Sequence, residues 1–262
     1  MAIAPTEASQ AGINAKVPKM IAVASGKGGV GKTWFAITLA HAFANAGRKT
    51  LLFDGDLGLA NVDIQLGLMP KHDLGAVVSG RMPLNQATTT FEDGGFDIIA
   101  GRSGSGSLTN IPTSRLQILS EDLLLMASRY DRVILDLVAG VENSVRQLLH
   151  AADTVLVVTR DEPTSLADAY AFIKLTALER PNLDIRVIIN ASNSTRAGER
   201  TYKTLCKACH TFLKVLPPLA GIIRSDARVR ETIRSQTPIL IRSPNSEASL
   251  DITAVAERLI AG

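Results

Sequence analysis

The chain has few of the residues that mark specialised protein classes. Of its 262 residues only two are cysteine, too few for a disulfide framework. Aromatic side chains make up 4% of the chain, so the expected core consists mainly of Ala, Val, Ile and Leu. No stretch approaches the ~18 apolar residues of a membrane span, and residues 1–19 contain no apolar run of the kind that a secretory signal needs. The sequence therefore predicts a cytoplasmic protein.

A strong charge of either sign is also lacking. The formal net charge of +3 is too small to indicate a nucleic-acid or membrane partner. Asp226 and Glu231 dilute the densest basic run, so we do not expect direct DNA binding; the run consists of Arg224, Arg228, Arg230 and Arg234. The last predicted helix has little of the Lys and Arg that a membrane-surface helix carries on its polar face. The tail therefore does not support membrane binding.

The two cysteines, Cys206 and Cys209, could form half of a zinc site or a redox pair. The sequence shows no second pair of ligands for them. Cys209 instead belongs to a set with helical spacing, which predicts a buried stripe: Leu205, Cys209, Phe212 and Leu216.

Short apolar runs alternate regularly with helical patterns. The runs are predicted strands at Met20–Ala24, Thr50–Asp54, Phe96–Ala100, Arg132–Asp136, Thr154–Thr159, Asp184–Ile189 and Leu219–Ile223. The predicted helices are Lys32–Ala46, Ser114–Ser128, Asn143–Ala151, Thr164–Glu179, Gly198–Leu213, Arg228–Ser235 and Glu247–Ile260. Such alternation predicts an α/β fold, a doubly wound and mostly parallel sheet with helices on both faces. We expect a flexible leader at 1–19, a single domain over 20–262, and ligands at the carboxyl ends of the strands.

The first predicted strand ends in a glycine-rich loop, Gly26–Thr33 (GKGGVGKT), which fits the P-loop pattern G-x-x-x-x-G-K-[ST]. Glycines let backbone N–H groups curl around an anion, and the following helix directs its positive dipole end at the phosphates. We expect Lys32 to contact the β- and γ-phosphates and the Thr33 hydroxyl to ligate Mg²⁺, so the predicted cofactors are ATP or ADP with Mg²⁺. The expected nucleotide contacts here are Gly26, Lys27, Gly28, Gly29, Val30, Gly31, Lys32, Thr33 and Trp34.

Acidic residues end two of the predicted strands. Asp54 and Asp56 close the second strand, and two acids so close at a strand end are costly unless a cation or a reaction uses them. Asp136 ends an apolar strand in the Walker B pattern. We expect Asp136 to hold the hydration shell of Mg²⁺ and to hydrogen-bond Thr33.

A second lysine in the loop, Lys27, makes the sequence resemble the deviant Walker A ATPases (KGGxGK[ST]), the family of the MinD and ParA proteins. The resemblance implies a slow, partner-stimulated ATPase that forms a homodimer with ATP. Lys27 would reach the partner's nucleotide and Asp56 would position or activate the attacking water, so the expected catalytic set is Asp56, Lys27 and Lys32. Asp54 would help to hold the Mg²⁺ shell. The expected metal site then comprises Thr33, Asp54, Asp56 and Asp136.

The resemblance also suggests where the base binds. An Asn at the end of the sixth predicted strand, Asn190, would read the adenine edge, although it could equally form a turn. Pro244 and Asn245 would cover the base, whereas Asn245 or Ser246 could instead only cap the last helix. The family usually has Ser or Thr directly after the Walker B acid. Here Leu137 follows, which predicts slow or altered hydrolysis.

Two further stretches are similar to the flagellar-number branch of this family, the FlhG, FleN and YlxH group. They are Asp54–Leu68 (DGDLGLANVDIQLGL) and Glu162–Lys174 (EPTSLADAYAFIK). The resemblance implies regulation of flagellar number or placement, with a placement GTPase, a switch protein or a transcription activator as partner. Two alternatives stay open: a positioning ATPase for a division site, plasmid, chromosome or organelle, and a non-catalytic nucleotide-dependent scaffold.

Overall fold

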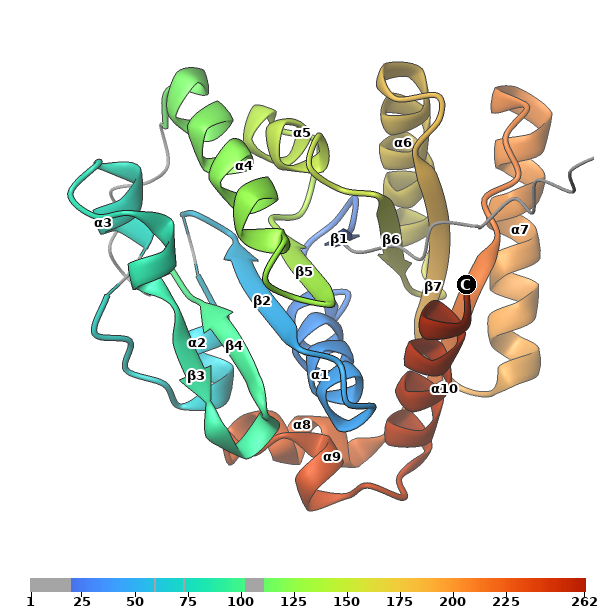
Figure 1. Ribbon diagram of the computed structural model, residues 1–262. Helices are drawn as coiled ribbons and strands as arrows, with labels where there is room; N and C mark the ends of the chain where they lie inside the picture. Colours follow the sequence, from blue (N-terminus) through green and yellow to red (C-terminus); the bar gives the residue numbers. More distant parts are fainter. Residues whose placement is uncertain (1–19, 59, 73, 102–110) are drawn as a thin grey trace, which may run out of the picture.

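A computed structural model describes residues 20–58, 60–72, 74–101 and 111–262 (Figure 1). The predicted leader at 1–19 lies outside these residues. The described chain contains one eight-stranded sheet in the order β3-β4-β2-β5-β1-β6-β7-β8. The strands are β1 (Met20–Ala24), β2 (Thr50–Gly55), β3 (Thr89–Phe91), β4 (Phe96–Ile99), β5 (Arg132–Leu137), β6 (Thr154–Thr159), β7 (Asp184–Ser192) and β8 (Leu219–Arg224).

All strand pairs are parallel except β3 with β4, which is antiparallel at one edge. Every residue of the central strands β1, β2, β5 and β6 is buried. This agrees with their nearly unbroken apolar sequences, because a parallel strand covered on both faces has no solvent side.

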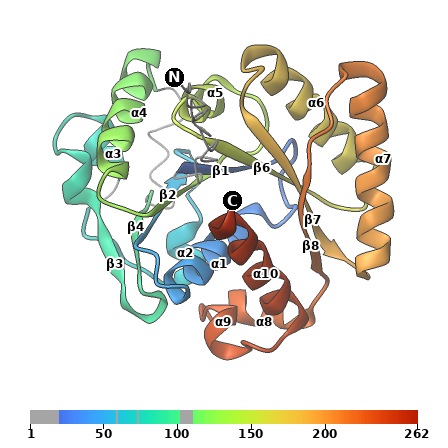
Figure 2. The same ribbon diagram turned by 45° about the vertical axis from the view of Figure 1, so that its right-hand side comes forward.

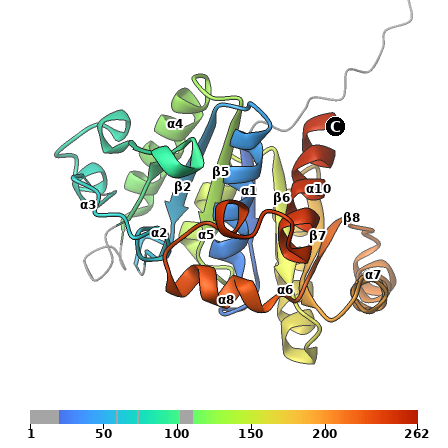
Figure 3. The same ribbon diagram turned by 90° about the horizontal axis from the view of Figure 1, so that it is seen from below.

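Helices form a layer on each face of the sheet. Along one face lie α4 (Thr113–Ala127), α5 (Asn143–Leu149), α6 (Pro163–Glu179) and α7 (Thr195–Leu213), as Figure 2 shows. On the other face are α1 (Lys32–Asn45) and α10 (Glu247–Ala261), next to each other in Figure 3, with α2 (Val62–Leu66), α8 (Ala227–Arg234) and α9 (Ile239–Arg242). A short helix, α3 (Leu74–Val78), and the turns η1 (Leu84–Ala87) and η2 (Glu92–Gly94) complete the described elements. The doubly wound α/β fold is therefore confirmed.

Helix α1 carries the P-loop and is buried on almost every side. It packs against the sheet and against α10, and Phe35 and Phe43 are fully enclosed in the same core cluster as Ile252 and Val255. Consequently the P-loop, at the N-terminus of α1, is anchored to a tightly packed helix.

The predicted stripe on α7 is only half correct. Leu205 and Cys209 are buried, as expected, but Phe212 is 74% exposed. Leu216 is 63% exposed and lies beyond the end of the helix at Leu213. Phe212 lies within α7 but on its solvent side, whereas Leu216 follows the αL residue Lys214, where the chain turns away from the helix axis.

Among the helices of the described ranges, none combines the length and apolar character required to cross a bilayer.

Candidate functional site

The P-loop leaves the sheet where the strand order reverses. Strand β1 lies between β5 and β6, so the loop opens at the carboxyl ends of three parallel strands. This is the switch point at which doubly wound folds bind their ligands. Gly29 and Gly31 have φ values of 79° and 87°, a region that glycine enters at low cost. The predicted loop therefore has the backbone curvature that an anion cradle requires.

Asn190 holds the P-loop from behind. Its amide Nδ2 donates a hydrogen bond to the Val30 carbonyl, with 2.7 Å between nitrogen and oxygen. A Cβ atom on Gly31 would lie 2.4 Å from that same nitrogen, so only glycine fits there. The side chain of Asn190 is buried at the end of β7. In this structure Asn190 braces the loop, and its contact with adenine stays a prediction.

Lys32 and Asp136 form a buried ion pair at the end of β5. Their Nζ and Oδ1 atoms are 2.6 Å apart, and the side chains are only 9% and 1% exposed. Within the described part of the chain, the second oxygen of Asp136, Oδ2, is buried and accepts no hydrogen bond. An unsatisfied buried carboxylate oxygen is costly unless a further cation or donor approaches it.

These residues fit a magnesium-bound nucleotide. The loop offers backbone donors, Lys32 a buried positive charge and Asp136 an unused oxygen, and Thr33, which follows Lys32 in the chain, is partly exposed. The predicted hydrogen bond between Asp136 and Thr33 is not formed among the described residues, because Oδ1 of Asp136 pairs with Lys32 and Oδ2 has no partner. Hard oxygen ligands of this type suit Mg²⁺, which keeps several waters and takes few protein ligands. When bound, the metal ion neutralises charge on the phosphoryl oxygens.

Asp54 is the partner of Asp136 on the neighbouring strand, in direct register across β2 and β5. Its carboxylate accepts backbone N–H bonds from Asp56 at 3.1 Å and from Asn61 and Val62 at 3.2 Å each. Burial, and then the negative charge of Asp136, raise the pKa of Asp54 to about 7. Asp54 therefore organises the loop that carries Asp56. A place for Asp54 or Asp56 in the metal shell stays a prediction.

The structure places Lys27 at the surface end of the loop. Its Nζ lies 3.2 Å from Oε2 of Glu162 and 2.9 Å from the Thr164 hydroxyl. Both partners lie at the start of α6, in the stretch that resembles the flagellar branch. Sequence reasoning did not identify them as contacts of Lys27, because 135 residues separate Lys27 from Glu162.

The remaining predicted nucleotide contacts differ in how deeply they are buried. Val30 and Trp34 are buried, and Trp34 lies in the core on the α1 side. Pro244 and Asn245 are exposed in the turn before α10. Ser246 caps α10, because its hydroxyl accepts the N–H of Ser249. The capping alternative is therefore correct for Ser246, and base contacts from Pro244 and Asn245 stay predictions.

Leu137 occupies the position at which the family usually has a hydroxyl. It is fully buried, opposite Gly55 in the sheet and close to Leu148. Since side chains alternate along a strand, Leu137 faces away from the side of the sheet that carries Asp136. The loop that follows is still tied to the P-loop, because the N–H of Gly140 donates to the Ser25 carbonyl at 2.8 Å.

Comparison with known proteins identifies the class. A family model described as the CobQ/CobB/MinD/ParA nucleotide binding domain matches residues 21–239. The chain therefore belongs to this family of nucleotide-binding proteins, as the sequence predicted.

Particular relatives are similar over nearly the whole chain. The antiactivator FleN of Pseudomonas aeruginosa is 38% identical over 92% of this chain and 86% of its own. The flagellum site-determining protein YlxH of Helicobacter pylori is 30% identical over 92% and 82%. Among solved structures, the septum site-determining protein MinD of Pyrococcus horikoshii, complexed with Mg-ADP, superposes with a TM-score of 0.78. It is 25% identical, and the match covers 92% of this chain and 95% of that one.

Proposed function

We propose that this protein is an ATPase that dimerises on ATP and regulates the number or placement of flagella. The observation that carries the proposal is the contrast between the two lysines of the P-loop. Lys32 is buried against Asp136, whereas the Lys27 side chain is 36% exposed at the rim. This contrast supports a role for Lys32 at the chain's own nucleotide and a role for Lys27 at the nucleotide of a second chain.

The chain's residues would work mainly by position and charge. The P-loop N–H groups and Lys32 bind the phosphates, and Lys27 of the partner adds positive charge where the phosphoryl oxygens become more negative. Asp56, at the end of β2, orients the attacking water. Because a single chain lacks the second lysine, ATP favours the dimer and hydrolysis removes that preference.

The flagellar assignment is supported by the relatives named for flagellar functions. We propose a flagellar protein as partner: a placement GTPase, a switch protein or a transcription activator. The MinD of Aquifex aeolicus, 26% identical over 93% of this chain, was solved in a complex with MinC, so a protein partner of this fold has a structural precedent. Positioning of another cargo is the second candidate, favoured by the likeness to septum site-determining proteins.

Deleting the gene in the source organism and counting flagella by electron microscopy tests the biological role. Extra, misplaced or absent flagella would support it, and complementation with the wild-type gene should restore the normal count. Unchanged flagella would contradict the flagellar role and favour another cargo. Co-sedimentation of the purified protein with DNA or liposomes in the presence of ATP would then separate the cargo classes.

A further inference from the structure

Lys27 has two partners in its own chain. Oε2 of Glu162 and the hydroxyl of Thr164 lie 3.2 and 2.9 Å from its ammonium group. In the proposed dimer, phosphate oxygens of the partner's nucleotide would replace this carboxylate and this hydroxyl as contacts of Lys27. Both partners come from the turn at the start of α6, which these two contacts join to the P-loop.

That turn is held firmly by its own hydrogen bonds. The hydroxyl of Ser165 accepts the N–H of Arg160 at 3.1 Å and lies 2.9 Å from the Thr159 hydroxyl, and Ser165 is buried. The N–H of Leu166 donates to the carbonyl of Glu162 at 3.0 Å. The Glu162 backbone is therefore fixed, and its side chain pairs with Lys27 through Oε2 and with Arg160 through Oε1, which lies 3.8 Å from Nη1 of that arginine.

The backbone of Lys27 is fixed as well. The Ser25 hydroxyl donates to the carbonyl of Lys27 at 2.9 Å. The neighbouring Gly26 packs so tightly on α6 that a Cβ atom there would lie 2.1 Å from the Asp168 carbonyl oxygen. With both backbones anchored, the contact between Lys27 and the turn is set by the fold.

We propose that Glu162 and Thr164 are positioning residues that hold Lys27 within its own chain, and that they oppose ATP-dependent dimerisation until the lysine is released. This inference rests on the proposed function, in which Lys27 acts across the dimer. Glu162 holds the lysine by charge and Thr164 by a neutral hydrogen bond. A ligand or partner protein that binds the start of α6 would alter the contacts of Lys27 with Glu162 and Thr164.

The ion pair between Lys27 and Glu162 should shift the equilibrium between monomer and dimer only modestly. The side chains of Lys27 and Glu162 are 36% and 46% exposed, and an exposed ion pair changes an equilibrium by at most about fivefold. Formation of a symmetric dimer would release two such contacts. Removing Glu162 should therefore lower the dissociation constant of the dimer by roughly 2- to 25-fold, the square of the effect of one contact.

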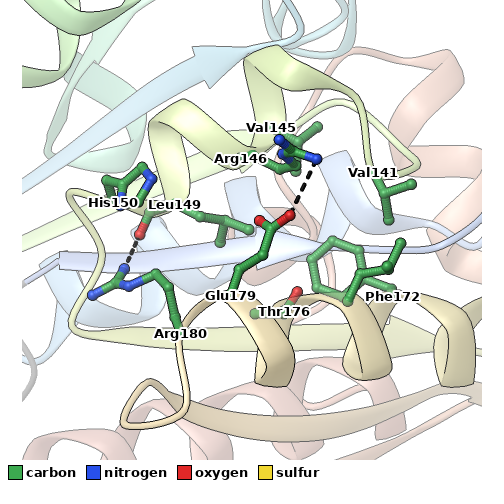
Figure 4. Close-up of a pocket in the computed structure, with 10 residues that line it drawn as sticks. Val141, Val145, Arg146, Leu149, His150, Phe172, Thr176, Glu179 and Arg180 are labelled. Atoms are coloured by element: carbon green, nitrogen blue, oxygen red, sulfur yellow. Dashed lines mark hydrogen bonds and ion pairs between the residues drawn. The ribbon is translucent and has the colours of Figure 1, made fainter.

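Sedimentation velocity of the full chain with Mg²⁺ and a slowly hydrolysed ATP analogue measures that constant. Glu162→Gln and Thr164→Val should each tighten the dimer, and the conservative Thr164→Ser should behave as wild type. Glu179→Gln is the matched control, because it removes the same charge at the other end of α6, which Glu162 caps. Glu179 pairs instead with Arg146, 3.1 Å away, at the far end of α6 (Figure 4).

A second measurement separates this effect from a change in nucleotide affinity. In a Lys27→Ala background, Glu162→Gln should leave binding of the analogue to the single chain unchanged. Thermal unfolding of each variant checks that the turn is still folded.

The outcomes distinguish failure of the proposed action of Lys27 across the dimer from failure of the inference about Glu162 and Thr164. If Lys27→Ala dimerises like wild type, the action of Lys27 across the dimer is wrong, and the inference about Glu162 fails with it. If Lys27→Ala loses the dimer while Glu162→Gln and Thr164→Val match Glu179→Gln, only the inference about Glu162 and Thr164 is overturned. A weaker dimer in Glu162→Gln would also overturn it, because Glu162 would then stabilise the dimer.

Discussion

Lys32 is the only cation that the structure pairs with Asp136 among the described residues. Two carboxylates, Asp136 and its neighbour across the strands, Asp54, lie buried at this point of the sheet. Buried charges of one sign are costly, and a single lysine offsets part of that cost. The same side chain is the expected ligand of the β- and γ-phosphates. At this residue, stability and nucleotide binding are therefore linked.

Replacing Lys32 with Ala should abolish nucleotide binding and also destabilise the protein. Affinity for ATP should fall by at least about 100-fold, because charge-assisted contacts to the phosphates are lost. Breaking the buried pair should cost about 3–5 kcal/mol of unfolding free energy. Calorimetric titration and urea denaturation measure the two effects, with circular dichroism confirming that the variant is folded. Unchanged ATP affinity in a folded variant would refute the P-loop assignment.

The raised pKa of Asp54 makes the stability of the nucleotide-free protein depend on pH. Burial and the charge of Asp136 bring the folded pKa to about 7, against an ordinary value of 3.8. Between these values the folded state keeps a proton that the unfolded state has lost, so stability falls as pH rises from about 4 to about 7. The total change is on the order of 4 kcal/mol, and the contribution is constant above that range.

The measurement is the free energy of unfolding at several pH values between 4.5 and 8, in chelator and without nucleotide. Asp54→Asn is the control, since it keeps an acceptor for the backbone N–H groups and cannot ionise. Burial lowers the pKa of His41, which acts in the opposite direction, but His41 is present in both proteins and cancels in the difference. A difference between wild type and variant that does not change with pH would contradict the prediction.

At the scale of elements, the close approach of α6 to the P-loop depends on one glycine. Gly26→Ala would place a Cβ atom 2.1 Å from the Asp168 carbonyl oxygen, and two backbones would have to move apart. We expect a loss of about 1–3 kcal/mol in unfolding free energy. Gly28→Ala is the matched control: nothing lies within 4 Å of the added Cβ, and its φ is not in the left-handed region. Equal melting temperatures for the two variants would show that this packing is unimportant.

Elements with a clear apolar pattern were predictable from the sequence, and most of the shortest elements were not. The seven predicted strands are all present. Helices α1, α4, α6, α8 and α10 match within one residue at each end and α5 within two, whereas α7 begins three residues earlier than predicted. Strand β3 has three residues, α2 and α3 have five each, and α9 has four, so none contains two full periods of its pattern. These elements depend on packing against the rest of the protein rather than on a sequence pattern of their own.

The candidate site shows the same limit. A local motif was sufficient to predict the P-loop and the acids at the ends of β2 and β5. Contacts between distant segments had no local signal: Asn190 lies 160 residues from Val30, and Glu162 lies 135 residues from Lys27. The parallel sheet brings these segments to one edge, and only the folded chain shows which side chains then meet.

At the scale of the whole molecule, the proposed cycle has an ATP-bound dimer and a monomer after hydrolysis. The lifetime of the dimer is then set by the hydrolysis rate. Asp56 would control that rate, because it orients the water, whereas Lys27 would control whether the dimer forms. Substituting Lys27 should therefore prevent dimer formation, whereas substituting Asp56 should prolong the life of the dimer.

Asp56→Ala should form an ATP dimer that persists, with phosphate release at least about 100-fold slower than in wild type, the range expected when a group that assists proton transfer or positions water is removed. Light scattering after ATP addition would show a stable dimer in the variant and a decaying one in wild type. Asp93→Ala, which removes an exposed acid in the turn at Glu92–Gly94, is the control and should decay like wild type. Unchanged phosphate release in Asp56→Ala would assign the water to another residue.

If wild type itself released no phosphate while dimerising on ATP, the protein would be a nucleotide-dependent scaffold, and the dimer would end only when ATP dissociates.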